Sequence, residues 1–128
     1  MKKQLIPLLA AIMLCLTSCE DEITITELSC ELQSVEHSLD ADTIRVTYKL
    51  EGEGDFKVVS WTYITPEGEV TIQLPEVPAE QHFTFTGQAK MRANASVKVN
   101  EGYVKVSYKA ITTDSTYVGI DQCEQQIN

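Results

Sequence analysis

The chain has 128 residues, of which 19 are Asp or Glu and 10 are Lys or Arg, so its formal net charge is −9. A chain this acidic is a poor candidate for binding nucleic acid, because that binding depends on Lys and Arg side chains that neutralise phosphates. The same charge argues against electrostatic docking on anionic lipid headgroups. The length suits one domain whose hydrophobic core needs no metal for stability.

The N-terminal segment is typical of a secretory signal peptide. Lys2 and Lys3 make a short basic start, and Leu5–Leu16 is an apolar run of 12 residues. A membrane-spanning helix needs about 20 residues, so this run is too short to cross a bilayer. A basic start followed by a short apolar run is the pattern of a signal peptide, which we predict for residues 1–18.

The apolar run ends in Leu16-Thr17-Ser18-Cys19. These four residues resemble the lipobox of bacterial lipoproteins, in which a diacylglycerol is attached to the cysteine and cleavage occurs just before it. A thiol is needed at that position because the thiolate is the attacking nucleophile. The resemblance implies that Cys19 carries lipid, that its new amine is acylated, and that these chains anchor the protein to a membrane.

Three acids follow the cysteine directly, and they make residues 19–22 an acidic tether. Glu20-Asp21-Glu22 resembles the surface-export signal of lipoproteins in the Bacteroidota. The resemblance implies a lipid-anchored protein of the outer membrane that is exposed at the cell surface. The alternative is a solvated tether that simply holds the domain away from anionic headgroups.

Residues 23–128 show no long helical period, and short alternating stretches rich in Val, Ile, Thr and Tyr predict an all-β domain. The clearest alternation is Phe83–Val99, which is apolar or glycine at every odd position and polar at every even one. One face of this stretch should therefore be core. The stretch is too long for one typical strand, so we expect a bend or break near Gly87 to Ala89, or a strand that serves two neighbours. The other predicted strands are Ile23–Gln33, Thr43–Leu50, Phe56–Thr65, Glu69–Leu74, Tyr103–Thr112 and Ser115–Glu124.

Turn residues separate these strands. Pro66-Glu67-Gly68 predicts a hairpin loop, because Pro suits the first corner and Gly supplies a positive φ at the end. Pro75 and Pro78 mark a loop that we expect to cross between sheets.

Two further turns set the predicted register of the last strands. Glu101-Gly102 predicts a two-residue turn that pairs Val99 with Val104. Thr113-Asp114 predicts another turn, and a two-residue loop there places Cys123 opposite Val104. A bulge would instead bring Val118 and Ile120 to the inner face, and the sequence does not decide between these two registers.

The four cysteines fall into different classes. Cys15 leaves with the signal peptide and Cys19 carries the lipid, which leaves Cys30 and Cys123 near the two ends of the domain. Compartments beyond the inner membrane permit disulfides. We predict a Cys30–Cys123 disulfide, and two buried free thiols are the alternative.

The whole pattern has about 7–8 strands and a single tryptophan, Trp61, in the third. It resembles an immunoglobulin-like antiparallel β-sandwich, in which a buried Trp on the third strand is common. The cysteines depart from that family, because its usual disulfide joins the second and sixth strands. The resemblance implies that the first and last strands are neighbours, which a Cys30–Cys123 bridge would link. Fibronectin-III-like and transthyretin-like sandwiches remain open.

The sequence contains no nucleophile elbow, P-loop, HExxH or Cys-x-x-Cys motif, and His37 and His82 lack a second ligand at metal spacing. We therefore predict that the protein is not an enzyme and holds no cofactor beyond its lipid. Glu51, Glu53 and Asp55 alternate with glycines and are the best candidates for a Ca²⁺ loop. The alternative there is a solvated acidic hairpin.

Two short segments resemble the acceptor motif for O-glycosylation in the Bacteroidota. They are Asp42-Thr43-Ile44 and Asp114-Ser115-Thr116, which makes Thr43 and Ser115 the candidate acceptors. Such acceptors must be exposed, and Asp-Thr and Asp-Ser are also ordinary turn pairs.

The predicted function is a non-catalytic binding or assembly module, with a surface glycan or an envelope protein as partner. Aromatic side chains could stack on sugar rings where they face outward, or belong to the core. The alternatives are a small enzyme or enzyme inhibitor of the cell envelope, and a fimbrial or adhesin-type subunit that exchanges an edge strand, with Phe83–Val99 as the relevant segment. The aromatic candidates are Trp61, Tyr63, Tyr103 and Tyr117, of which Tyr103 is expected on the outer face.

Overall fold

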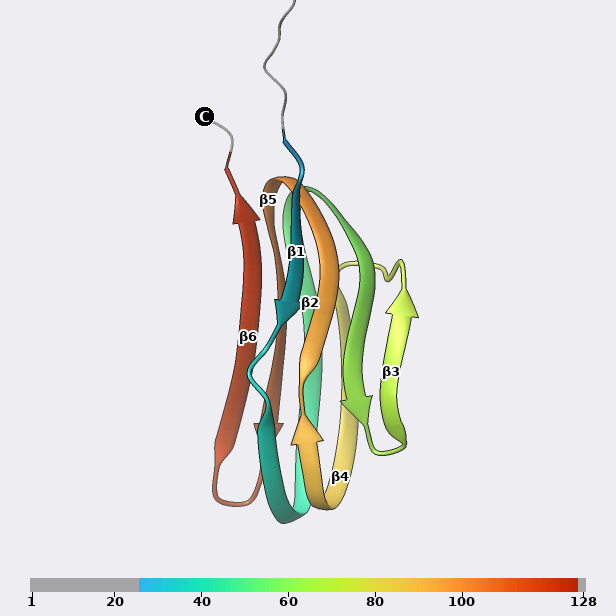
Figure 1. Ribbon diagram of the computed structural model, residues 1–128. Helices are drawn as coiled ribbons and strands as arrows, with labels where there is room; N and C mark the ends of the chain where they lie inside the picture. The colour runs from blue at the N-terminus through green and yellow to red at the C-terminus, as the bar shows by residue number, and fades with distance from the viewer. Residues whose placement is uncertain (1–25, 127–128) are drawn as a thin grey trace, which may run out of the picture.

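The computed structural model describes residues 26–126, so the predicted signal peptide, Cys19 and the acidic tether lie outside the described part. The described residues form six antiparallel strands and no helix, which confirms the all-β prediction (Figure 1). None of them forms a helix long and apolar enough to cross a membrane. The strands are β1 (Leu28–Gln33), β2 (His37–Thr65), β3 (Gly68–Gln73), β4 (Ala79–Met91), β5 (Ala93–Ile111) and β6 (Thr116–Gln125).

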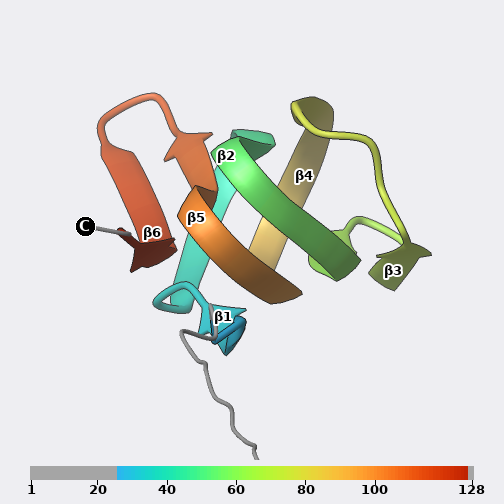
Figure 2. The same ribbon diagram turned by 90° about the horizontal axis from the view of Figure 1, so that it is seen from above.

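Two long strands organise the sheet. β2 has 29 residues and β5 has 19, and they pair with each other while their halves pair with different neighbours. The first layer runs β1–β5–β2–β3, through the N-terminal half of β5 and the C-terminal half of β2. The second layer runs β4–β2–β5–β6, through the other halves. Figures 1 and 2 show the two layers, with β2 and β5 passing from one to the other.

Glycines allow β2 and β5 to cross between the layers. Gly54 has φ 98° and Gly102 has φ 100°, and the two residues lie directly opposite each other in register. The predicted hairpin turn at Glu101-Gly102 is therefore wrong, because β5 continues through it. Val99 pairs with Leu28 and Phe56 rather than with Val104. A hairpin and a layer crossing both need a positive φ and both keep the apolar side chains inside, so the pattern could not separate them.

The bend predicted near Gly87 is present. Gly87 has φ 79° and pairs with Ala41, where the β2–β4 register shifts by a bulge before Ile44. Figure 1 shows both strands turning at this level. The ladder itself breaks later, at Arg92 between β4 and β5, where the guanidinium pairs with Glu36 and Glu69.

The remaining turns agree with the sequence. Thr65 pairs with Gly68, which has φ 125°, so the loop predicted at Pro66-Glu67-Gly68 is confirmed. Residues 74–78, which carry both loop prolines, join β3 in the first layer to β4 in the second. Cys123 pairs with Val104, so β6 follows the register without a bulge.

The core lies between the layers and is lined by the alternate residues of β2 and β5. Tyr48 and Tyr63 come from the two halves of β2, and their rings stack with centroids 5.2 Å apart. The Tyr48 hydroxyl donates to the Ile64 carbonyl at 2.6 Å, which satisfies its polar end inside the core. Trp61 is also buried, and it lies in the second strand rather than the predicted third, because Thr43–Leu50 and Phe56–Thr65 are parts of one continuous strand, β2.

Burial of the core tyrosines predicts that stability falls at alkaline pH. Desolvation by burial raises the pKa of Tyr108 to about 12, and it also raises the pKa of Tyr48 and Tyr63 above their ordinary value. The folded state then holds these protons more tightly than the unfolded chain, whose tyrosines titrate near pH 10. The stabilising contribution is complete below pH 10 and is lost as pH rises through about 12.

An alkaline titration followed by tyrosinate absorbance and Trp61 fluorescence tests this prediction. We expect a late absorbance step that coincides with loss of the buried-tryptophan signal. Full ionisation of every tyrosine near pH 10 with unchanged fluorescence would contradict it.

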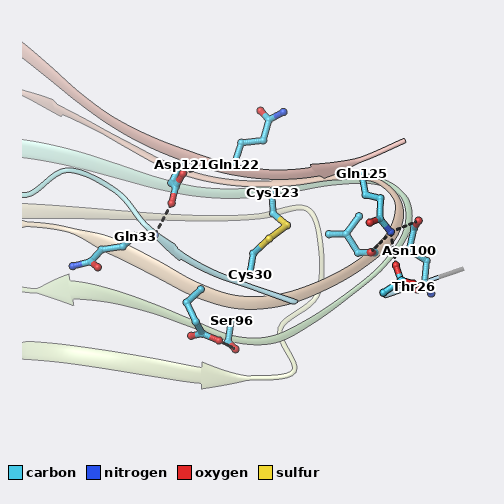
Figure 3. Close-up of a disulfide and its surroundings, with 11 residues drawn as sticks. Thr26, Cys30, Gln33, Ser96, Asn100, Asp121, Gln122, Cys123 and Gln125 are labelled. Carbon is cyan, nitrogen blue, oxygen red and sulfur yellow. Dashed lines mark hydrogen bonds between the residues drawn. A yellow bond between two sulfur atoms is a disulfide. The ribbon is translucent and has the colours of Figure 1, made fainter. Parts of the chain in front are cut away.

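The predicted disulfide between Cys30 and Cys123 is confirmed. It links β1 to β6, which share no ladder, across a Cα–Cα distance of 6.2 Å. Each neighbouring contact joins a side chain to the backbone: the backbone N–H of Gln33 donates to the Asp121 carboxylate at 2.9 Å, and the Gln125 side chain donates to the Thr26 carbonyl at 2.8 Å (Figure 3). The first and last strands are thus neighbours that are held by a covalent bond and side chains.

Candidate binding face

The three acids predicted to wrap a cation do not form a loop. Glu51, Glu53 and Asp55 lie along β2 where it crosses between the layers, and Asp55 accepts a hydrogen bond from Asn100 at 3.3 Å. The described residues contain no group of three or more His, Cys, Asp or Glu side chains that could hold a metal ion. The alternative of a solvated acidic hairpin is also wrong, because β2 continues through these residues without a turn. The structure does not bring the three acids together.

Both histidines have structural partners. His37 Nδ1 lies 2.7 Å from the Tyr108 hydroxyl, which donates to the Val35 carbonyl at 2.7 Å. This contact fastens the segment between β1 and β2 to β5. His82 pairs with Glu80 at 2.8 Å on the exposed side of β4.

The candidate sugar-stacking residues divide between core and surface. Trp61 and Tyr63 are 1% and 4% exposed, so they belong to the core and cannot stack on a glycan. Tyr103 and Tyr117 are half-buried. Tyr103 directly precedes the buried Val104 in β5, so its side chain lies on the outer face, as predicted.

The two candidate glycosylation residues are both exposed and lie at one end of the molecule. Thr43 sits in the bulge of β2, and Ser115 follows the tight turn between β5 and β6. Residues 38–42 and 112–115 line one groove of about 570 Å³ together with Tyr117. Their glycosylation stays a prediction.

The outer side of the second layer combines cationic and aliphatic side chains. In β2 and β5 the outward residues alternate with the buried ones, and in β6 the outward residues Val118 and Ile120 are exposed. The register places Lys109 between Thr47 and Val118, and Ser107 between Lys49 and Ile120. We call this surface the cationic face, and it comprises Arg45, Lys49, Lys105, Lys109, Ile111, Val118 and Ile120.

The cations of this face are unusual in an acidic chain. Lys2 and Lys3 precede the described residues, which leaves eight of the 10 Lys and Arg, and four of these eight lie on the cationic face. Lys49 and Lys105 have Glu80 and Glu51 in register, whereas Arg45 and Lys109 face no acid. Within residues 26–126 none of the four forms an ion pair. The end of the face that carries Arg45 and Lys109 is therefore the part where cations have no acid in register, on a chain that is acidic overall.

Exposed aliphatic residues adjoin these cations. Val118 is 47% exposed, Ile120 54% and Ile111 36%, and they cluster along β6 and the adjoining end of β5. They line a shallow groove of about 430 Å³ together with Lys49 and Lys109 and with two acids, Glu51 and Glu80. An apolar cluster with charges beside it is the usual composition of a protein-binding surface.

Sequence reasoning did not identify this face. Its signal was present, because the polar positions of residues 43–50 and 103–112 carry the four cations. The signal could not be used without knowing that these two segments are neighbouring strands of one layer, and the erroneous turn at Glu101-Gly102 placed them apart.

Comparison with known proteins adds no family to these observations. The chain matches no protein-family model, no curated protein and no solved structure.

Proposed function

We propose that this chain is a lipid-anchored lipoprotein of the bacterial outer membrane, displayed at the cell surface, and that it acts as a non-catalytic binding module through its cationic face. The observation that carries the binding role is that four of the eight Lys and Arg in residues 26–126 lie on one face beside exposed aliphatic residues. The exposed aliphatic side chains of this face contribute nothing to the core, and an exposed apolar cluster is typical of a surface that binds a partner.

The domain itself is proposed to be an immunoglobulin-like β-sandwich. Two four-membered layers around a core that buries Trp61 support this assignment, although Trp61 lies in the second strand rather than the third. The disulfide between the first and last strands is this chain's own departure from the family pattern.

The proposed anchor keeps the domain close to the membrane. From Cys19 to Leu28, the first residue of β1, there are nine residue steps (28 − 19). A fully extended chain covers at most about 3.6 Å per step, so the tether reaches about 30 Å. A partner must therefore lie at the membrane surface or extend to it.

A Cys19→Ala variant tests the anchor. Wild-type protein should incorporate labelled fatty acid and sediment with membranes, whereas Cys19→Ala should incorporate none, because the alanine has no thiol to take the lipid. Cys30→Ala/Cys123→Ala is the matched control, since it removes thiols without removing the predicted lipid site. Continued labelling of Cys19→Ala would contradict the anchor.

The strand pairing bears on the alternative function, a fimbrial or adhesin-type subunit that exchanges an edge strand. Within its segment, Phe83–Val99, the part in β5 is paired on one side with β1 and on the other with β2, whereas the part in β4 pairs with β2 alone among the described strands. β6 is the edge strand at the other side of the same layer, since it pairs with β5 alone among the described strands.

A further inference from the structure

We propose that the free edge of β6 accepts an extended acidic segment of a partner protein, which adds to the second layer as a further strand. This inference rests on the proposed binding function and specifies its partner. The ligand would be a polypeptide that alternates carboxylate and aliphatic side chains.

The backbone of β6 offers a short, unpaired edge. In an antiparallel ladder, successive residues direct their N–H and C=O groups alternately toward and away from the neighbouring strand. The backbone N–H of Gln122 donates to the Asp121 side chain at 2.9 Å, so the backbone N–H and C=O groups of Gln122 point away from β5. The alternation then directs the backbone groups of Ile120 and Val118 to the same free edge, and no other described residue bonds to them.

The side chains at this edge are suited to a strand partner. Val118 and Ile120 project from the outer face and are about half exposed, since no strand lies beyond them. A strand placed at the usual spacing of about 4.8 Å would bring its own aliphatic side chains into contact with both. The same addition would satisfy the open backbone groups, which is how β-strand addition gains affinity.

The cations near β6 favour an added strand that carries carboxylate side chains. Lys109 lies directly beside Val118, and Arg45 lies diagonally beyond Lys109 on β2, one strand further from β6. An added strand is two strand spacings from β5, about 10 Å, which the long side chains of Lys and Glu bridge over Val118. The net charge of −9 does not prevent this contact, because charges beyond about 8 Å are screened at physiological salt.

The available edge is limited at both ends. Toward the C-terminus, the Asp121 carboxylate accepts hydrogen bonds from the backbone N–H of Gln122 and from the backbone N–H of Gln33 in β1. The disulfide follows at Cys123. An inward-reaching charge of this kind is a common way to close a sheet edge. At the other end β6 begins at Thr116, so the partner strand would pair with residues 116–120.

A second copy of this chain fits the edge less well. Antiparallel pairing of two β6 strands would cover Val118 and Ile120 but would bring two cationic faces side by side, including both copies of Lys109. Like charges at that spacing oppose association. An acidic polysaccharide would satisfy the cations but would leave the backbone edge and the aliphatic side chains without partners.

Peptide binding to the mature lipidated protein in nonionic detergent tests the proposal. The probe is a fluorescent, end-blocked peptide of alternating Glu and Val, and the controls are a Lys-Val peptide and a Glu-Val peptide with N-methylated backbone. We expect the Glu-Val peptide to bind at least about tenfold more tightly than either control. Amide signals of Val118 and Ile120 should shift on binding.

Variants separate the two sources of affinity. Arg45→Gln/Lys109→Gln should weaken the Glu-Val peptide about tenfold, whereas Lys57→Gln/Lys98→Gln, which removes equal charge from the first layer, should not. Ile120→Pro removes an edge N–H that β5 does not use, and Val118→Ser/Ile120→Ser removes only the aliphatic contacts. Both should also weaken binding while circular dichroism stays unchanged; should Ile120→Pro lose its fold, Val118→Ser/Ile120→Ser serves alone.

Several results would overturn strand addition. They are equal binding of the N-methylated peptide, absence of any peptide binding, binding of polygalacturonate that is indifferent to the edge variants, or a concentration-dependent dimer that those variants abolish. If cells still show cross-links from Ser107 on the cationic face while the peptide does not bind, the binding module stands and strand addition fails.

Discussion

Replacing Cys30 and Cys123 together by alanine is expected to lower the free energy of unfolding by about 4 kcal/mol. The bridge closes a loop with a sequence separation of 93 residues, and long loops restrict the unfolded chain most strongly. β1 and β6 share no ladder, so within the described residues only side-chain contacts remain to hold them together. Since domains of this size have about 5–15 kcal/mol in total, the loss would be a large fraction of the stability.

Urea unfolding of the double variant and of the wild type with a thiol reductant measures this effect. Both should lose the same free energy, because both remove the same covalent link, and alanine at the buried Cys123 adds no polar group to the core. A loss below about 1 kcal/mol in both would show that β1 and β6 are held by their other contacts.

The second large effect is expected at the layer crossing. Gly102→Ala should destabilise the fold by about 4 kcal/mol or prevent folding, since two separate costs coincide there. The residue has φ 100°, which side chains rarely adopt, and an added Cβ would lie 1.9 Å from the Glu53 carbonyl oxygen. That oxygen belongs to the backbone of the neighbouring strand, so it cannot move without opening the β2–β5 ladder.

Gly87→Ala is the matched control, because it shares the positive φ, 79°, and has no atom within 4 Å of the added Cβ. It should cost only about 1 kcal/mol, the penalty for the backbone conformation. The difference between the two variants therefore isolates the close approach of β2 and β5. Equal unfolding free energies for both variants would contradict the crossing as described.

The alternation of apolar and polar residues was sufficient to predict the strands and their inward faces. It limited the β5–β6 register to two pairings at the Thr113-Asp114 turn without deciding between them, and the structure has the one that places Cys123 opposite Val104. The disulfide followed from the small number of cysteines. These features depend on local pattern and on residue counts, which one sequence contains in full.

The order of strands within a layer is not a local property. Glu101-Gly102 fits a hairpin turn and a layer crossing equally well, and only the partner residues Gly54 and Asp55 in β2 decide between them. The candidate face depends on the same information, since Lys49 and Lys109 become neighbours only through the β2–β5 pairing. The sequence displayed the cations but not their common surface.

We propose above that this anchored domain binds a partner through its cationic face. The most direct measurement is photo-cross-linking in intact cells, with the photoreactive residue at Ser107 in the middle of the face or at Lys98 on the opposite layer. We predict a discrete cross-linked product from Ser107, its absence from Lys98, and its loss in Cys19→Ala. Equal products from both positions, or none from Ser107 in membrane-anchored protein, would contradict the account.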